Sequence, residues 1–336
     1  MKRLISSVVT LVLVASLVAV PAALAQTSGQ ATGNFTILSA SPTVTAVALY
    51  NANGTATETA MTPQVEYKIN VTVGDANTLN DLDWVNVTLF YDADGSYDPL
   101  DVPTSGNNQT AALLSHPVNT STWSIAAGTT TTWSVVTGNC TEPTLTASSG
   151  TFEFNFKPGN VSTETIAPAK WHIYAIATDD TNLTGDSYEA NKDMNWYGAI
   201  TLYTASLSWG AVAPGLDFAD PGANKTGINA TYIANGDYNE TVAASGTWTG
   251  ALIDATLNAT ASPLQQEFSL KADDTAVLGN AVNVTASPTY VVIDDTGAQT
   301  LEEGNNVNTN TLWLKLGTPF VNETYTGSIY YAVANG

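Results

Sequence analysis

Four aspartates lie close together in one turn-like part of the chain. Asp92, Asp94, Asp98 and Asp101 surround Gly95, so carboxylates recur at alternating positions about a glycine turn. Carboxylate oxygens in such an arrangement can bind Ca²⁺. The segment lacks the bidentate glutamate that ends an EF-hand loop, and an acidic hairpin turn explains the same residues without a metal. A calcium site at these four aspartates is therefore one hypothesis, a plain turn is the other, and no cofactor is required.

Two further acidic turns follow the same pattern. One runs from Asp75 to Asp83 and the other from Asp179 to Asp186. Loops at the two ends of a sandwich can bring distant turns together, and a cation held there would offset part of the net charge of −21.

The two histidines belong to no recognisable catalytic motif. His116 precedes Pro117 in a Ser- and Asn-rich segment that we expect to be a loop, and His172 lies in an apolar segment typical of a strand. No Gly-x-Ser-x-Gly elbow occurs, and no His/Cys spacing indicates zinc. Paired carboxylates for glycoside hydrolysis have no local signature, because folding brings them together. We predict that the protein is not an enzyme and has no catalytic residues.

Asparagines in Asn-x-Ser/Thr acceptor sequences are unusually frequent. Such sequences accept N-linked glycans in exported proteins, and glycans would hydrate a chain that has few charges. The alternative is that Asn and Thr simply gather in loops and on exposed strand faces. The fifteen acceptors are Asn34, Asn53, Asn70, Asn86, Asn108, Asn119, Asn139, Asn160, Asn182, Asn224, Asn229, Asn239, Asn258, Asn283 and Asn322.

The single cysteine, Cys140, lies inside the acceptor sequence Asn139-Cys140-Thr141 and has no partner for an internal disulfide. Stability must therefore come from burial rather than from disulfides. Cys140 is either a small buried residue or a link between two subunits.

The N-terminus has the features of a secretion signal. Lys2 and Arg3 precede the apolar run Leu4 to Val20, and Ala23-Leu24-Ala25 is a small-x-small cleavage motif. We predict a signal peptide over residues 1–25 and a secreted or cell-surface product that keeps no membrane span after processing. A retained membrane anchor is the alternative.

The charge composition excludes a nucleic-acid partner. The 336 residues include 9 Lys or Arg and 30 Asp or Glu, only 12% charged residues in all, and Arg3 is the sole arginine. Phosphate recognition needs clustered Lys and Arg, which the chain does not offer.

Period-two alternation predicts strands almost throughout the mature chain. In the segment 65–73, Val65, Tyr67, Ile69, Val71 and Val73 fall on one face, which we expect to be buried. Similar runs occupy residues 85–91, 151–156, 171–177, 199–207, 226–233, 241–248, 267–270, 281–285, 290–293, 311–316 and 328–333.

The predicted fold class is all-β, with two tandem immunoglobulin-like or jelly-roll-like β-sandwich domains after a cleaved signal peptide. About 310 mature residues exceed what one sandwich of roughly 100 to 150 residues holds. We expect a flexible segment at 26–33, a first sandwich at 34–205 and a second at 206–336.

Three segments resemble archaeal secreted proteins. Residues 61–67, 75–85 and 193–198 are similar to segments of N-glycosylated tandem β-sandwich surface proteins, a group that includes surface-layer, sheath and extracellular filament subunits. The resemblance implies a structural subunit that assembles with copies of itself, and it carries over no catalytic residues.

The start of the predicted mature chain is a candidate for such assembly. Phe35, Ile37 and Leu38 form a short apolar pattern that can add to a neighbouring copy as a donated strand. An ordinary first strand of its own domain is the alternative.

A different function, that of an adhesin or carbohydrate-binding module, would need exposed aromatic side chains. The candidates are Trp123, Trp133, Trp248 and Trp313, for which we expect burial in the core instead.

Overall fold

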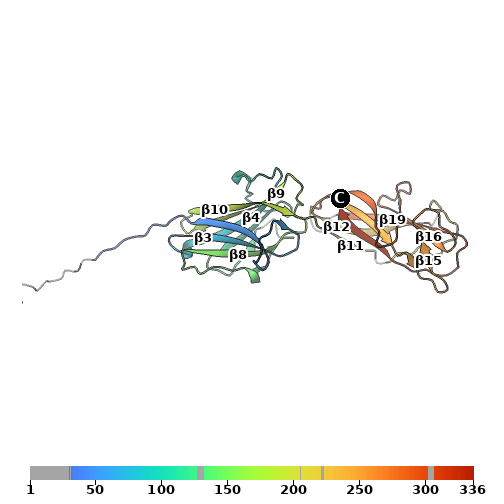
Figure 1. Cartoon of the computed structure of the whole chain (residues 1–336), viewed down its shortest axis with the longest axis horizontal. Helices are drawn as coiled ribbons and strands as arrows, with labels where there is room; N and C mark the ends of the chain where they lie inside the picture. Colours follow the sequence, from blue (N-terminus) through green and yellow to red (C-terminus); the bar gives the residue numbers. More distant parts are fainter. Residues whose placement is uncertain (1–29, 31, 127–131, 205, 221–222, 302–305) are drawn as a thin grey trace, which may run out of the picture. The chain divides into compact units, whose positions relative to one another are not determined.

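The computed structural model describes residues 30, 32–126, 132–204, 206–220, 223–301 and 306–336. The expected signal peptide, residues 1–25, and most of the expected flexible segment, residues 26–33, lie outside these ranges. The chain divides into two units, Met1–Ser39 and Ala40–Gly336. Regular structure in the described ranges consists of strands and a few 3-10 turns (Figure 1), so the all-β fold class is confirmed.

The first part of the second unit contains two sheets. One has the order β1 (Thr43–Asn51), β3 (Tyr67–Gly74), β8 (Ser149–Lys157) and β7 (Ser134–Val135). The other has the order β2 (Ala60–Met61), β10 (Thr184–Met194), β9 (Lys170–Asp179), β4 (Leu82–Asp92), β5 (Ala111–Pro117) and β6 (Ser124–Ile125). All neighbours are antiparallel except β2 and β10, which are parallel.

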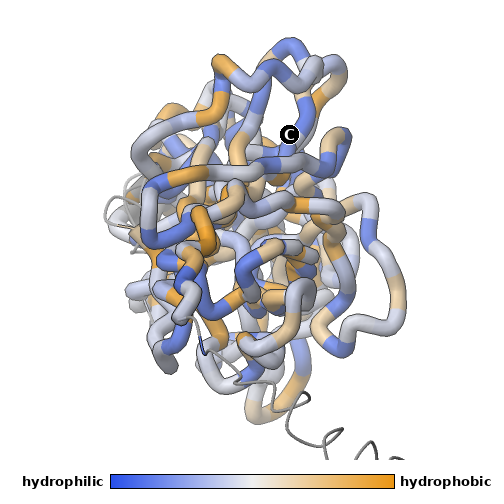
Figure 2. The backbone as a smooth tube through the Cα atoms, turned by 90° about the vertical axis from the view of Figure 1, so that its left-hand side faces the viewer, coloured by the Kyte–Doolittle hydropathy of each residue, from blue (hydrophilic) through white to orange (hydrophobic). Residues whose placement is uncertain are grey.

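Alternate residues of these strands form one core. Ile69 and Val71 of β3 and Phe152 and Phe154 of β8 are buried, whereas the residues between them are half-buried or exposed. Figure 2 shows apolar and polar residues interspersed along the backbone. Successive side chains of a strand point to opposite faces, so alternation alone selects the buried set.

One residue of the predicted alternating face is not in the core. Val65 is 46% exposed, because β3 starts only at Tyr67. Before it, Gln64 adopts φ 65° and the Val65 N–H donates to the Thr62 carbonyl at 3.2 Å. This local turn removes Val65 from the strand, and its predicted burial is wrong.

The later part of the second unit contains two further sheets. The larger has the order β11 (Gly198–Leu202), β12 (Asn224–Ala234), β19 (Asn306–Leu316), β16 (Glu267–Asp273), β15 (Ala255–Leu257) and β14 (Thr247–Trp248), with β17 (Val282–Asn283) beside β16. The smaller has the order β18 (Val291–Gly297), β13 (Tyr238–Ala244) and β20 (Ile329–Asn335). Their shared core includes Val242, Phe268, Leu270 and Leu312. We call these two sheets the second sandwich, and the two before them the first sandwich.

Sheet partners change earlier in the chain than the expected boundary at residues 205 and 206. Strand β11 pairs with β12, with Gly198 opposite Ala234, so it belongs to the second sandwich. The change therefore falls between Met194 and Gly198. Here the buried Asn235 accepts from the Tyr197 N–H at 2.6 Å and donates to the Ser162 carbonyl at 2.8 Å.

No helix within the described ranges has the length and apolar character that a membrane crossing requires.

Candidate functional site

The proposed calcium ligands begin at Asp92, the last residue of strand β4. Three of them accept hydrogen bonds from backbone N–H groups of their own loop. Asp92 and Asp94 each accept from the N–H two residues further on, at 3.1 and 2.8 Å. Asp98 accepts in the same way from Leu100 at 2.8 Å, and the Asp101 N–H donates to the Asp98 carbonyl at 3.0 Å. These are the hydrogen bonds of Asx turns, and they account for the loop as a turn.

Side-chain placement gives the metal hypothesis no support. Within the described ranges, no three or more His, Cys, Asp or Glu side chains are placed to hold a metal ion. The calcium site at Asp92, Asp94, Asp98 and Asp101 stays a prediction.

His172 is packed behind this loop. It is fully buried, and its Nε2 lies 3.7 Å from Asp92 Oδ2, beyond hydrogen-bond distance. Nδ1 accepts from the Asn191 N–H at 3.4 Å, so the proton of the neutral ring lies on Nε2. Burial lowers the pKa of His172, against the opposing effect of the Asp92 and Asp94 carboxylates. A neutral, enclosed imidazole of this kind is a structural residue.

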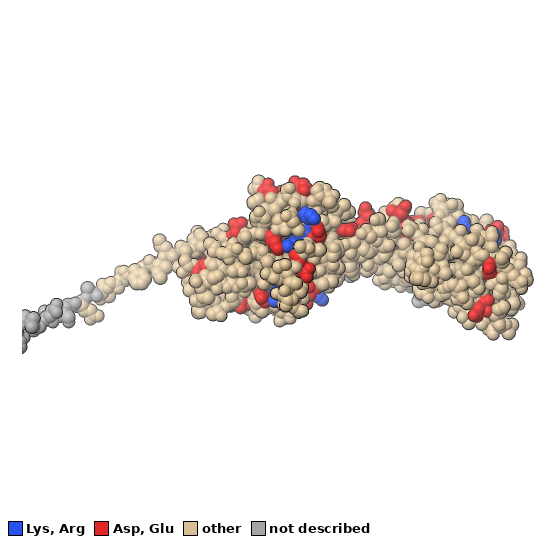
Figure 3. Space-filling view, in the orientation of Figure 1, with Lys and Arg blue, Asp and Glu red and all other residues tan. Residues whose placement is uncertain are grey.

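The second and third acidic turns lie together at one end of the first sandwich. Asp179 is opposite Leu82 across β9 and β4, and the Asp180 N–H donates to the Asp81 carbonyl at 2.9 Å. The charge of Asp81 is the main cause that raises the pKa of Asp180. Burial raises the pKa of Asp75, and the charges of the other three aspartates add to the effect. This end is therefore strongly negative, whereas most of the face seen in Figure 3 carries neutral residues.

His116 is also structural, and its expected placement in a loop is wrong. It lies in β5 and is fully buried. Its ring stacks on Trp123 with 3.7 Å between centroids, and its Nε2 and Nδ1 lie 2.7 Å from Glu142 Oε2 and 2.8 Å from the Thr122 carbonyl. Thr122 and Glu142, which contact the His116 ring, lie outside β5. From the sequence alone, the polar residues of β5 therefore resemble those of a loop.

The tryptophans considered as sugar-binding residues are in the core, as expected. Trp123, Trp133, Trp248 and Trp313 are at most 9% exposed. They therefore form no exposed aromatic row of the kind that a sugar-binding face would need.

The glycan acceptors differ sharply in exposure. The exposed ones are Asn34, Asn53, Asn119, Asn139, Asn182, Asn229 and Asn322, and the half-buried ones are Asn70, Asn86, Asn108, Asn239, Asn258 and Asn283. Asn160 is only 5% exposed, and the side chain of Asn224 lies outside the described set. Asn119 and Asn182 have φ values of 62° and 65° and lie in turns.

Glycan occupancy is expected to follow this exposure. In protein secreted by a glycosylating host, Asn182→Gln should lower the intact mass by one glycan, whereas Asn160→Gln should leave the glycan mass unchanged. Glycopeptide mass spectrometry checks both variants. A glycan on Asn160 would contradict the expectation, because the folded chain encloses that amide.

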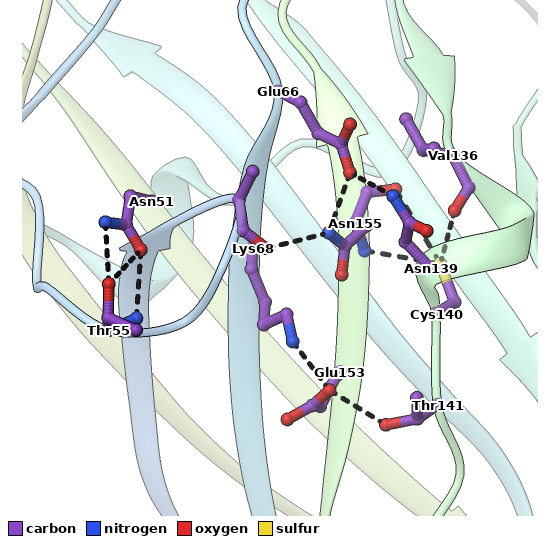
Figure 4. A network of polar contacts seen from close by, with 11 residues as sticks. Asn51, Thr55, Glu66, Lys68, Val136, Asn139, Cys140, Thr141, Glu153 and Asn155 are labelled. Carbon is purple, nitrogen blue, oxygen red and sulfur yellow. Dashed lines mark hydrogen bonds and ion pairs between the residues drawn. The ribbon is translucent and has the colours of Figure 1, made fainter.

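Cys140 lies beside β8 in a network of polar contacts (Figure 4). Its Sγ accepts from the Asn155 N–H at 3.2 Å and lies 3.6 Å from the Val136 carbonyl oxygen. Next to it, Asn139 Nδ2 donates to Glu66 Oε1 at 2.7 Å, and the same oxygen accepts from Asn155 Nδ2 at 2.9 Å. Burial raises the pKa of the thiol. The half-buried sulfur thus acts as a structural hydrogen-bonding group.

Cys140 is expected to react slowly while the chain is folded. A raised thiol pKa and partial burial reduce both the thiolate fraction and access, so modification by a maleimide should be at least about tenfold slower than in denaturing urea. The matched control is Ser124→Cys in a Cys140→Ser background, which places a thiol at an exposed residue. A dimer that reductant dissociates would contradict this expectation and favour the intersubunit link.

The proposed assembly residues lie outside any strand. Phe35, Ile37 and Leu38 are 88%, 72% and 84% exposed, and the first strand begins at Thr43. They do not form a first strand of the sandwich that follows them, which was the alternative to donation.

The second sandwich contains cavities that no sequence pattern predicts. After β11 the chain leaves its sheet, and residues 206–209 border a cavity of about 400 Å³ together with Leu202, Trp248 and Tyr331. An adjoining cavity of about 610 Å³ shares Trp209, Trp248 and Tyr325. These spaces depend on the path of the chain after β11, which has no local signature.

A buried carboxyl group in the same sandwich is also absent from the sequence predictions. Glu240 of β13 is fully buried and accepts hydrogen bonds from Tyr232 Oη, from Asn310 Nδ2 and, at 2.8 Å, from Asn308 Nδ2. Burial raises its pKa to about 7, although the two amides act in the opposite direction. The neighbours of Glu240 in β13 are the polar residues Asn239 and Thr241, so no sequence pattern indicates that its side chain is buried.

Comparison of the chain with protein-family models and with curated proteins gives no match. Its function must therefore be inferred from its own residues and their arrangement.

Proposed function

We propose that the protein is a non-enzymatic structural subunit of an archaeal extracellular assembly, either a filament, a sheath or a surface layer. It is secreted, carries N-linked glycans and assembles with copies of itself. One observation carries the proposal, which is the exposure of Phe35, Ile37 and Leu38 in a segment that belongs to no strand.

Large apolar side chains that are exposed in one copy favour contact with another protein surface that buries them. Burying a Phe, Leu or Ile side chain fully stabilises a complex by about 1.5 to 3 kcal/mol. An extended segment also offers its backbone N–H and C=O groups to the edge of a neighbouring sheet. A donated N-terminal strand uses both contributions, and every copy has one segment to donate.

The exposed acceptor asparagines support a surface location. Seven of the fifteen acceptor sequences have exposed asparagines, among them Asn119 and Asn182 in turns. Glycans there would hydrate a surface on which only 12% of all residues are charged. The partners of the protein are then its own copies and its glycans, with no nucleic acid.

Electron microscopy of the secreted, glycosylated full-length protein tests the proposal. We expect regular filaments or sheets from the parent chain and dispersed particles after deletion of Asn34–Ser39. Deletion of residues 26–31 is the matched control and should leave assembly intact. Dispersed parent protein, with and without calcium, would overturn the proposal, and assembly that survives the Asn34–Ser39 deletion would overturn strand donation.

The cavities favour a second candidate function, that of a secreted adhesin or carbohydrate-binding module. Trp209 and Tyr325, which are half-buried, border both cavities, and aromatic rings of this kind stack on sugars. A glycan-array screen distinguishes the two candidates, because an assembly subunit does not need a free sugar ligand.

A further inference from the structure

We propose that the 400 Å³ cavity of the second sandwich accepts the Asn34–Ser39 segment of a second copy of the chain. The inference rests on the proposed function, since it names the surface through which copies assemble. We call this surface the acceptor cavity and the segment the donor segment.

The acceptor cavity lies beside two strand edges. Leu202 at the end of β11 and Ile329 and Tyr331 in β20 border it. Among the described strands, β11 is hydrogen-bonded only to β12 and β20 only to β13, although the second edges of β11 and β20 approach one another at Gly198 and Val333. An incoming extended segment can therefore pair with an edge and direct alternate side chains into the cavity.

Two residues that border the acceptor cavity each have a buried polar atom without a hydrogen-bond partner among the described residues. These atoms are Nε1 of Trp248 and Oη of Tyr331. A buried polar group without a partner costs about 1 to 3 kcal/mol. Both atoms are enclosed, so a carbonyl of an incoming backbone reaches them only if the wall of the acceptor cavity moves.

The donor segment has large apolar side chains, which suit a cavity that is bordered by uncharged residues. Phe35 and Ile37 are two residues apart, so a strand conformation places both on one face. They are large, apolar and exposed, as an incoming group must be before it docks.

Charge favours the same occupant. Residues 4–57 contain no Asp, Glu, Lys or Arg, and the residues that border the acceptor cavity are uncharged. Two copies that each carry a net charge of −21 repel one another, and contact through neutral surfaces keeps that repulsion small. Ser and Thr at the rim, such as Ser206 and Thr324, match the Thr and Ser residues of the donor segment.

Disulfide trapping between two full-length variants tests the proposal. Both carry Cys140→Ser; one carries Ile37→Cys and the other carries Ser206→Cys or Ser208→Cys, two exposed residues at the cavity rim that belong to no glycan acceptor sequence. The matched control acceptor is Thr256→Cys, exposed on β15 of the same sandwich. We expect disulfide-linked heterodimers in at least about tenfold higher yield with either rim variant than with the control, because docking raises the effective thiol concentration.

The outcomes separate this inference from the proposed function. Equal yields for rim and control variants, with filaments still formed by the parent chain, would overturn the acceptor cavity and leave the subunit function in place. Absence of filaments or sheets from the parent chain would overturn the proposed function whatever the trapping yield. Protection of the Ser206→Cys thiol by soluble oligosaccharides but not by a synthetic peptide of residues 34–39 would assign the cavity to a glycan and overturn the inference.

Discussion

Replacing Glu240 by Gln is expected to stabilise the second sandwich by about 3 kcal/mol at pH 8 and to have little effect near pH 4. The buried Glu240 carboxylate is ionised in the native protein only above a pKa of about 7, compared with 4.5 for a free glutamate. The glutamine side chain has nearly the same shape and carries no charge. The Asn310 amide can turn its oxygen toward the new donor, since that oxygen has no hydrogen-bond partner among the described residues.

The direction in which the free energy of unfolding changes with pH follows from proton binding. Because the native pKa of Glu240 is raised, the folded state binds more protons than the unfolded state between about pH 4.5 and pH 7. The free energy of unfolding therefore falls as pH rises through this window and stays low above it. The titratable groups around Glu240 are Tyr232, which donates a hydrogen bond to it, Tyr331, whose pKa is raised by burial, and the carboxylates of Asp294 and Asp274.

Urea unfolding at several pH values, followed by hydrogen exchange of β12, β13 and β19, measures the effect. Glu58→Gln, in the first sandwich, is the matched control and should keep the pH dependence of the parent chain. A pH slope that persists in Glu240→Gln would show that another group causes it. The substitution keeps the Asn239-x-Thr241 acceptor sequence, so glycan occupancy does not confound the comparison.

Replacing Trp171 by Ala is expected to destabilise the first sandwich by about 3 to 5 kcal/mol. Trp171 is fully buried near the start of β9 and packs against Tyr91 and Trp133, with 6.0 and 5.8 Å between ring centroids. Its Nε1 donates to the Thr163 carbonyl at 2.9 Å, and alanine leaves that carbonyl without its donor. The loss thus combines a cavity with an unpaired acceptor.

Two further variants separate these contributions in urea titrations followed by circular dichroism. Trp171→Phe keeps most of the ring but loses the hydrogen bond, and should lower the free energy of unfolding by about 1 to 3 kcal/mol. Trp84→Ala removes a tryptophan that is 42% exposed on the neighbouring β4 and should have a smaller effect than Trp171→Ala. Equal effects at both tryptophans would contradict the packing described for Trp171.

Most of the longer strands could be predicted, because alternation is a local property. Runs such as 85–91, 151–156 and 171–177 coincide with β4, β8 and β9. The run 199–207 is longer than β11, which ends at Leu202. Its later residues are apolar enough to look like a strand, but Leu207 packs against the core without strand pairing.

Strands without clear alternation were not predicted. Strand β10 (Thr184–Met194) contains charged residues, among them the buried Lys192, and β5 contains Ser115 and the buried His116. Their places in the sheet come from pairing with β9 and β4, far away in the sequence. A polar residue enters such a strand when another segment supplies its partner, as Glu142 does for His116.

The amino-acid sequence by itself determined the all-β class, the alternating core residues of β3 and β8, the burial of the four tryptophans and the absence of arginine after Arg3. Each depends on residue type or on spacing within one strand, where backbone geometry imposes a period of two. Only the tertiary structure decided the burial of Glu240, the meeting of the acidic turns at Asp81 and Asp180, the enclosure of Asn160 and the acceptor cavity. Each of these results from contacts between residues distant along the chain, and strand pairing alone brings such residues together.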